Sequence, residues 1–182
     1  MTMTQELSVT RSLCVGSLTK VTAILSLALT LAWVSGSDRV NAQEPTSQSV
    51  KDRSERTYTP LIIAKQDNDI TFQVEVADND NTRALGLMFR TKMLENEGMI
   101  FDFGESRPVY MWMQNTYISL DMLFINEQGR VHHIVESTTP LSRSLIGSGG
   151  SVRYVLEVKA GTVKRHQLKK GDQVQHQLFT SN

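Results

Sequence analysis

Hydrophobic and polar positions between residues 61 and 178 follow one another in short runs, a pattern typical of strands. Apolar and polar residues alternate from Ile70 to Val76, and this period of two predicts a half-buried strand with Ile70, Phe72, Val74 and Val76 facing inward. Similar short runs, separated by turn residues, predict further strands at Leu61–Ala64, Gly98–Phe101, Val109–Trp112, Met122–Ile125, Val131–Val135, Tyr154–Lys159 and Asp172–Leu178.

Two short helices interrupt the strand pattern. Asp78–Asn81 supply turn and N-cap residues for a helix over Thr82–Phe89, in which Ala84, Leu87 and Met88 share one face. A second helix is predicted over Thr162–Lys170, capped by Thr162 and stopped by Gly171. Asn126–Gly129 predict a hairpin turn, and residues 136–151 a long polar loop. The fold class that follows is α+β, mostly β: a compact, partly closed, small β-barrel-like sheet with two short helices.

The N-terminal region has the pattern of an export signal. The uncharged apolar run Val21–Val34 follows Arg11 and Lys20 and precedes small residues ending in Val40-Asn41-Ala42. We expect a secretory signal peptide over residues 1–42, cleaved after Ala42, and a periplasmic or extracellular protein. The alternative is an uncleaved signal that tethers the chain to the inner membrane, although the apolar run is short for a bilayer span. Residues 43–59 are polar and predict a disordered linker, which leaves residues 60–182 as a single globular domain.

Composition then excludes most catalytic chemistry. The only cysteine, Cys14, precedes the predicted cleavage point, so disulfides, thiolate zinc sites and cysteine nucleophiles are not expected after processing. Lys+Arg and Asp+Glu both number 19, and we expect no nucleic-acid partner. The four histidines lack metal-ligand spacing, and Asp78-x-Asp80-x-Thr82 lacks the later residues of a calcium loop. We therefore expect no metal and no cofactor.

Two features remain as candidate chemistry. Arg83 and Arg90 are seven residues apart on the predicted helix, and the face they share, with Gly86 between them, could receive an anion; alternatively, both pair with structural carboxylates. In Val109–Ile125, polar residues interrupt an apolar stretch rich in Met and Trp. Either these polar residues form and cap a turn, or they face a pocket. In the pocket interpretation, Trp112 and Met113 form the wall, and Asn115, Thr116 and Asp121 supply polar groups.

Four blocks of residues occur in order along the chain: Arg83-x-x-Gly86-Leu87-Met88-Phe89-Arg90; Glu97-Gly98-Met99-Ile100-Phe101-x-Phe103; Trp112-Met113-x-Asn115-Thr116-x-Ile118-x-Leu120-Asp121-x-Leu123-Phe124-Ile125; and Tyr154-Val155-Leu156-Glu157-Val158-x-Ala160-Gly161. Over roughly residues 70–177 the chain resembles the family catalogued as domain of unknown function 192. The resemblance implies a small single domain of mixed strands and short helices, often exported in bacteria, with no established activity. Three positions depart from the family pattern: Met111 replaces an aromatic residue, Gln114 a lysine and Ser119 a proline. The missing lysine weakens an anion site at that position.

Three functions are consistent with these residues. The first is a non-catalytic accessory or ligand-binding domain of the cell envelope, with a small polar or anionic ligand in a cleft around Arg90, Trp112, Asn115 and Asp121. Arg83, Thr116 and Glu157 complete the candidate ligand-binding residues. The second is a hydrolase that pairs Asp121 with Glu97 or Glu157. The third is a protein-interaction module with an exposed patch of Met111, Trp112 and Met113.

Overall fold

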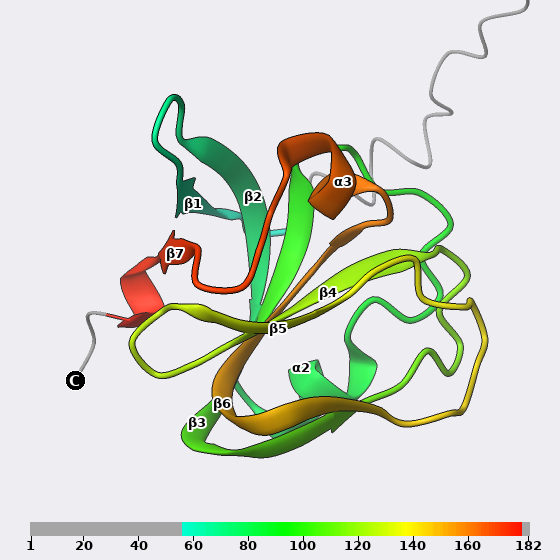
Figure 1. The fold of residues 1–182 in the computed structure, drawn as a ribbon. Helices are drawn as coiled ribbons and strands as arrows, with labels where there is room; N and C mark the ends of the chain where they lie inside the picture. Colours follow the sequence, from blue (N-terminus) through cyan, green and yellow to red (C-terminus); the bar gives the residue numbers. More distant parts are fainter. Residues whose placement is uncertain (1–55, 180–182) are drawn as a thin grey trace, which may run out of the picture. The chain divides into compact units, whose positions relative to one another are not determined.

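The computed structural model describes residues 56–179, which form one mixed sheet of seven strands with two short helices (Figure 1). The signal segment, and the linker as far as residue 55, lie outside the described residues. The strand order is β5-β4-β6-β3-β2-β1-β7. In chain order the elements are β1 Thr59–Ala64, β2 Ile70–Ala77, α2 Asp80–Leu85, β3 Glu97–Met111, β4 Leu120–Ile125, β5 Val131–Val135, β6 Ile146–Lys159, α3 Thr162–His166, β7 Gln173–Gln175 and the 3-10 turn η1 Gln177–Phe179.

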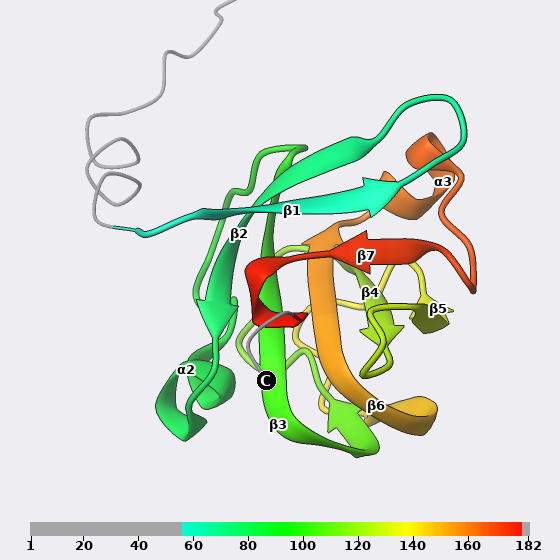
Figure 2. The same cartoon turned by 90° about the vertical axis from the view of Figure 1, so that its left-hand side faces the viewer.

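Strand pairing is antiparallel except between β2 and β3, which run parallel and are joined through α2. The short strand β7 lies beside β1 at one edge of the sheet, as Figure 2 shows. Backbone hydrogen bonds also connect the segment before β7 to the start of β5 at the other edge: Val131 N–H donates to the Asp172 carbonyl, and Gly171 N–H donates to the Val131 carbonyl. The two edges therefore meet at one end. The predicted mostly β, partly closed sheet with two short helices is confirmed.

Both faces of the sheet are covered. One face carries a core that includes Phe72, Ile100, Leu156 and Val163, and α3 packs on this side. The opposite face carries a second core, whose residues include Leu87, Met99, Phe101, Met113, Met122 and Val155. Neighbouring residues of β6 thus enter different cores, because strand side chains alternate between faces. Within residues 56–179 no helix has the length and apolarity needed to cross a bilayer.

The helices are shorter than the sequence pattern predicts. Asn79 caps α2, and the helix ends at Leu85 because Gly86 takes φ 48°. The predicted helix over Thr82–Phe89 is therefore wrong at its end, and Arg90, which lies beyond α2, shares no helix face with Arg83. The second helix ends at His166 rather than Lys170, and its N-cap is Gly161 rather than Thr162.

The strand predictions need three corrections. The segments Gly98–Phe101 and Val109–Trp112 belong mainly to one long strand, β3, which bends where the register shifts between Asp102 and Arg107. Residues 146–151, expected to lie in a loop, form the first half of β6. The predicted strand Asp172–Leu178 is reduced to the three residues of β7, followed by η1.

Candidate functional site

A row of register partners places two glutamates on the face of the sheet that the second core covers. Glu157 of β6 pairs with Met99 of β3 and with Met122 of β4, and Met99 also pairs with Glu75 of β2. Cross-strand partners share a face of the sheet. Glu75 and Glu157 therefore point to the same side, with Met99 between them.

The carboxyl group of Glu157 is buried in an apolar environment. Burial raises its pKa to about 8, and the nearby Arg90 guanidinium acts in the opposite direction. Both Arg90 nitrogens Nη1 and Nη2 donate to the two carboxylate oxygens of Glu75, at 2.5 Å each. None of the described residues donates a hydrogen bond to the Glu157 carboxyl. At neutral pH this group is therefore mostly an uncharged acid, which can itself donate a hydrogen bond.

A small cleft opens over Glu157. Its volume is about 30 Å³, which is room for roughly two water-sized groups. The end of α2 forms one wall and the segment after β3 forms the other. Gly86 fits closely at the end of α2, because a Cβ there would lie 3.3 Å from the Phe101 ring. The lining residues are Arg83, Ala84, Leu85, Gly86, Leu87, Met88, Phe101, Met111, Trp112, Gln114, Thr116 and Glu157.

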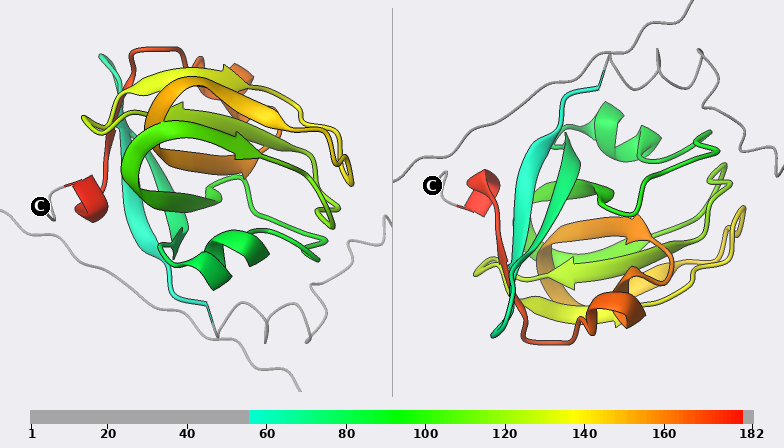
Figure 3. Two further views of the ribbon diagram at one scale, coloured as in Figure 1. Left: turned by 90° about the horizontal axis from the view of Figure 1, so that it is seen from below. Right: turned by 90° about the horizontal axis from the view of Figure 1, so that it is seen from above.

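The loops 86–96 and 112–119 contribute lining residues to this cleft. Together with the loop 136–145 they reach the same end of the sheet, as Figure 3 shows. Backbone hydrogen bonds connect them. Phe89 N–H donates to the Asn115 carbonyl, and Leu141 N–H donates to the Thr116 carbonyl. These contacts fix the positions of the cleft walls relative to each other.

The polar residues proposed from the sequence divide between this cleft and other places. Arg83, Trp112, Thr116 and Glu157 line it. Arg90 lies beside it, paired with Glu75. The Asn115 side chain is outside the lining set, and its Nδ2 lies 3.8 Å from the sulfur of Met88.

Asp121 lies on the opposite face of the sheet from Glu157. Its register partner is Val158, so its side chain points into the core that contains α3. It is fully buried, and its two carboxylate oxygens accept hydrogen bonds from the backbone N–H groups of Ser137 and Val163, each at 2.8 Å. This arrangement gives Asp121 a structural role, and it supplies no polar group to the cleft over Glu157.

The other carboxyl of the hydrolase hypothesis, Glu97, is two residues before Met99 in β3 and accepts a hydrogen bond from Leu94 N–H at 2.9 Å. It is absent from the lining set of the cleft. Neither Asp121–Glu97 nor Asp121–Glu157 therefore forms a carboxyl pair across this cleft, which is the arrangement that a hydrolytic mechanism of this kind needs.

Glu75, the partner of Arg90, was not predicted from the sequence. The alternation in Ile70–Val76 placed Glu75 on the side away from the core, where a charged residue would be solvated. In the structure that side is also covered. A sequence signal for this second covered face was present in β6. There Val155 alternates with Tyr154, Leu156 and Val158, so apolar residues occur on both faces of the strand. All of these residues, and Glu157 between them, are buried.

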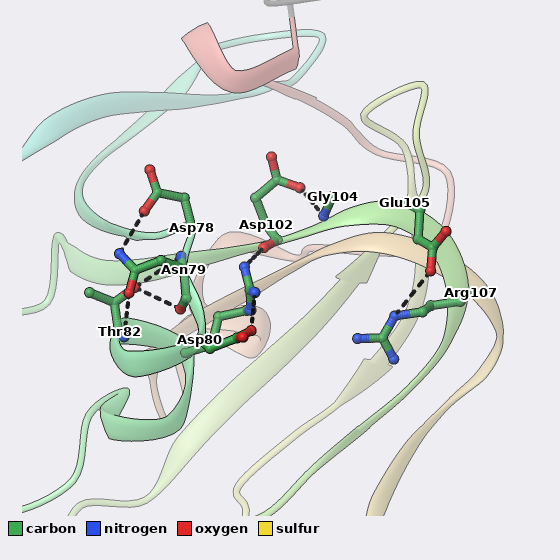
Figure 4. Close-up of polar contacts among 9 residues, drawn as sticks. Asp78, Asn79, Asp80, Thr82, Asp102, Gly104, Glu105 and Arg107 are labelled. Atoms are coloured by element: carbon green, nitrogen blue, oxygen red, sulfur yellow. Dashed lines mark hydrogen bonds and ion pairs between the residues drawn. The ribbon is translucent and has the colours of Figure 1, made fainter.

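Acidic residues near the start of α2 serve local structure. Figure 4 shows the capping box, in which the Asn79 side chain accepts from Thr82 N–H and the Thr82 hydroxyl oxygen accepts from Asn79 N–H. Arg83 joins Asp80 to the Asp102 carbonyl, with Nη2 and Nη1 as donors. Among the described residues, no three histidine, cysteine or acidic side chains are grouped in a way that could hold a metal ion.

Comparison with known proteins gives a family and two solved structures. The model of the family DUF192, described as an uncharacterized ACR, matches residues 61–176. A Sinorhizobium meliloti protein described as a candidate transcription regulator is 43% identical, with a TM-score of 0.64 over 66% of this chain and 96% of that one. A protein of unknown function from Novosphingobium aromaticivorans is 32% identical, with a TM-score of 0.63 over 65% of this chain and 85% of that one. No curated protein matches the chain significantly.

Proposed function

We propose that this chain, which belongs to the DUF192 family, is an exported, non-catalytic ligand-binding domain of the cell envelope. Its cleft holds a small polar or anionic group against Glu157. The observation that carries this proposal is the buried Glu157 carboxyl at the base of a cleft, with no hydrogen-bond donor to it among residues 56–179. A polar group that has no partner from the protein bonds to whatever enters the cleft, and a ligand that pairs with it better than water does is favoured.

The groups that line the cleft favour a ligand with hydrogen-bond acceptors. Glu157 is mostly protonated at neutral pH, and Arg83, Gln114 and Thr116 can each donate a hydrogen bond. A carboxylic acid that donates to an anionic oxygen forms a charge-assisted hydrogen bond, which is stronger than a neutral one. A carboxylate or a carbonyl group therefore fits this cleft better than an ammonium group.

The binding test uses acetate as the probe and calorimetry to measure its affinity for each variant. In the unsubstituted protein, the carboxyl ¹³C signal of Glu157 reports where acetate binds. We expect acetate to shift this signal in the purified protein, and we expect Glu157→Leu to bind acetate at least about tenfold more weakly, a change of about 1.4 kcal/mol. Glu136→Gln, a change at an exposed glutamate, is the matched control and should leave acetate affinity unaltered. Equal acetate affinity in Glu157→Leu and the unsubstituted protein would refute the proposal.

A pH series gives a second test. As pH rises through about 8, Glu157 ionises and repels an anionic ligand, so acetate should bind more tightly at pH 6 than at pH 9. The other charged groups near this face are Arg90 with Glu75, Arg83 with Asp80, and Glu97. Glu157→Gln keeps a donor and cannot ionise; it should therefore bind acetate with little change across this range. An identical pH dependence in Glu157→Gln would assign the titration to another of these groups.

Export is tested separately from binding. If the signal peptide over residues 1–42 is removed, mass spectrometry of the protein recovered outside the cytoplasm should give an N-terminus at Gln43. An intact N-terminus on membrane-bound protein would favour the tethered alternative, and full-length protein in the cytosol would contradict export.

A further inference from the structure

Large apolar side chains are exposed on the residues that line the cleft and on residues next to them. Leu85 and Trp112 line the cleft and are about half exposed, at 55% and 49%. Phe89 and Tyr117 are similarly exposed, with ring centroids 6.4 Å apart in an edge-on arrangement. Leu141 N–H is bonded to the carbonyl of cleft-lining Thr116, and its side chain is also exposed. We call Leu85, Phe89, Trp112, Tyr117 and Leu141 the rim cluster.

Two residues of the rim cluster have a strained backbone. Phe89 and Leu141 have φ values of 64° and 61°, which phenylalanine and leucine rarely take, at a cost on the order of 1 kcal/mol each. Asn115, whose carbonyl accepts from Phe89 N–H, has φ 57°, a value that asparagine takes more readily. Strained backbone at a binding site is one way in which the shape of the site is set before the ligand arrives.

The size of the cleft limits what can enter it. A volume of about 30 Å³ admits the two oxygens of a carboxylate group and excludes the body of a larger molecule. The remainder of a ligand must therefore lie outside, over the rim cluster. Apolar side chains there favour an apolar chain or ring.

The two arginines near Glu157 differ in how firmly they are paired. Arg83 pairs with Asp80 through Nη2, and because the Asp80 side chain is 99% exposed this ion pair is weak. An incoming anion can replace Asp80 at Nη2, while Nη1 stays bonded to the Asp102 carbonyl at 2.7 Å. The pair between Arg90 and Glu75 is shielded, with side chains 12% and 15% exposed, and it stays in place as the support beside Glu157.

We infer that the cleft takes a monocarboxylate with an apolar tail, its carboxylate meeting Glu157 and Thr116 and its tail lying across the rim cluster. This inference rests on the proposed binding function and names the ligand class. A fatty acid and the C-terminal residue of an apolar peptide present the same chemistry.

The experiment measures the affinity of the purified protein for acetate, butanoate and hexanoate by calorimetry. Each methylene that is fully covered should tighten binding by up to about fourfold, so hexanoate should bind at least about tenfold more tightly than acetate. Hexylamine, with the same tail and an ammonium head, should bind at least about tenfold more weakly than hexanoate. N-acetyl-leucine and its amide form the peptide arm: a higher affinity for N-acetyl-leucine than for hexanoate assigns the site to peptide termini, and the reverse assigns it to fatty acids.

Matched tyrosine variants locate the tail. Tyr117→Ala should lower the ratio of hexanoate to acetate affinity, whereas Tyr110→Ala, at an exposed tyrosine outside the rim cluster, should leave that ratio as it is. If acetate binds at Glu157 but chain length has no effect, or if hexylamine binds as tightly as hexanoate, the ligand class is wrong while the proposed function stands. If neither acetate nor hexanoate perturbs Glu157, both fail together.

Discussion

Two buried carboxyl groups, one on each face of the sheet, illustrate two different uses of an acidic residue in the interior. Asp121 has a backbone donor for each oxygen. Glu157 has none among the described residues and has its pKa raised to about 8. Both lie in short apolar stretches, Leu120–Ile125 and Tyr154–Val158, and the pattern of residue types does not separate them. The difference comes from what covers each face. Over Asp121, the start of α3 and the loop after β5 each supply one N–H group, whereas the loops over Glu157 leave a cleft.

Glu157 makes stability depend on pH in a predictable direction. A carboxyl whose pKa is higher in the folded protein than in the unfolded chain favours folding when protonated, and this contribution is lost as pH rises from about 4.5 to about 8. We expect the unsubstituted protein to lose on the order of 3 kcal/mol in free energy of unfolding over this interval through Glu157. Glu157→Gln, which cannot ionise there, should lack this loss. Urea denaturation from pH 5 to pH 8 measures it: the variant should gain on the unsubstituted protein as pH rises. Parallel stability curves would show that Glu157 ionises normally.

Asp121→Ala should destabilise the protein strongly. The substitution leaves the N–H groups of Ser137 and Val163 without an acceptor, and the loss should be about 3 kcal/mol in free energy of unfolding. Hydrogen exchange at the Val163 amide should accelerate in parallel. Asp78→Ala is the control: this exposed carboxylate accepts a hydrogen bond from the Asn79 side chain, and its removal should change stability by less than about 0.5 kcal/mol. A similarly small effect at Asp121 would contradict the structural role.

At the scale of elements, local patterns predicted most strands and failed where distant parts of the chain decide the conformation. The period of two in Ile70–Val76 is a property of one strand, and β2 follows it. Residues 146–151 are rich in Gly and Ser and indicated a loop. They form part of β6 because β3 pairs with them and because aromatic rings occupy the space at two glycines: Tyr110 lies against Gly147, and His132 against Gly150. Neither ring is near in sequence.

The candidate site shows the same division. Thr116 was selected from the sequence because polar groups within apolar stretches need partners or a cavity, and Trp112 as the wall of that pocket. Arg83 was selected for the anion-binding face that it would share with Arg90, and Glu157 as a carboxyl of the hydrolase hypothesis. Arg90 was assigned to a helix face, yet it acts from a loop, because α2 has only six residues and ends at Leu85. Gly86 was the local stop signal, and the predicted helix ran past it. Its pairing with Glu75 depends on the parallel alignment of β2 and β3, which follows only from the complete sheet.

The contact of β1 with the chain after β7 depends on a neutral histidine. Leu178 N–H donates to Nδ1 of His176, so Nε2 carries the proton and donates to the Thr59 hydroxyl at 2.8 Å. Burial lowers the pKa of His176 below 6.5. The unfolded chain then binds the proton more readily, and stability from this group should fall as pH drops below 6.5. Titration of the ring by NMR should give the Nε2–H tautomer and a lowered pKa; an Nδ1–H tautomer or a raised pKa would contradict the assignment.

At the scale of the described domain, closure of the sheet depends on contacts at one end between its two edges. Gly129, in the turn between β4 and β5, accepts a hydrogen bond from Val174 N–H at its carbonyl and has φ 74°. A Cβ at this position would lie 2.7 Å from the Val174 carbonyl oxygen. The closed end therefore admits no side chain at residue 129.

Gly104 provides a matched control for this position. Its φ is 79°, and a Cβ there would meet nothing within 4 Å. Gly104→Ala should therefore cost only the backbone strain, about 1 kcal/mol. Gly129→Ala should lower the free energy of unfolding by that amount and, because its Cβ would separate β5 from β7, by about 1–2 kcal/mol more for one lost edge hydrogen bond. Denaturation gives the two costs, and hydrogen exchange at Val131, Gly171 and Val174 should accelerate only in Gly129→Ala. Equal costs for the two variants would contradict the hydrogen-bonded contact between the two edges of the sheet.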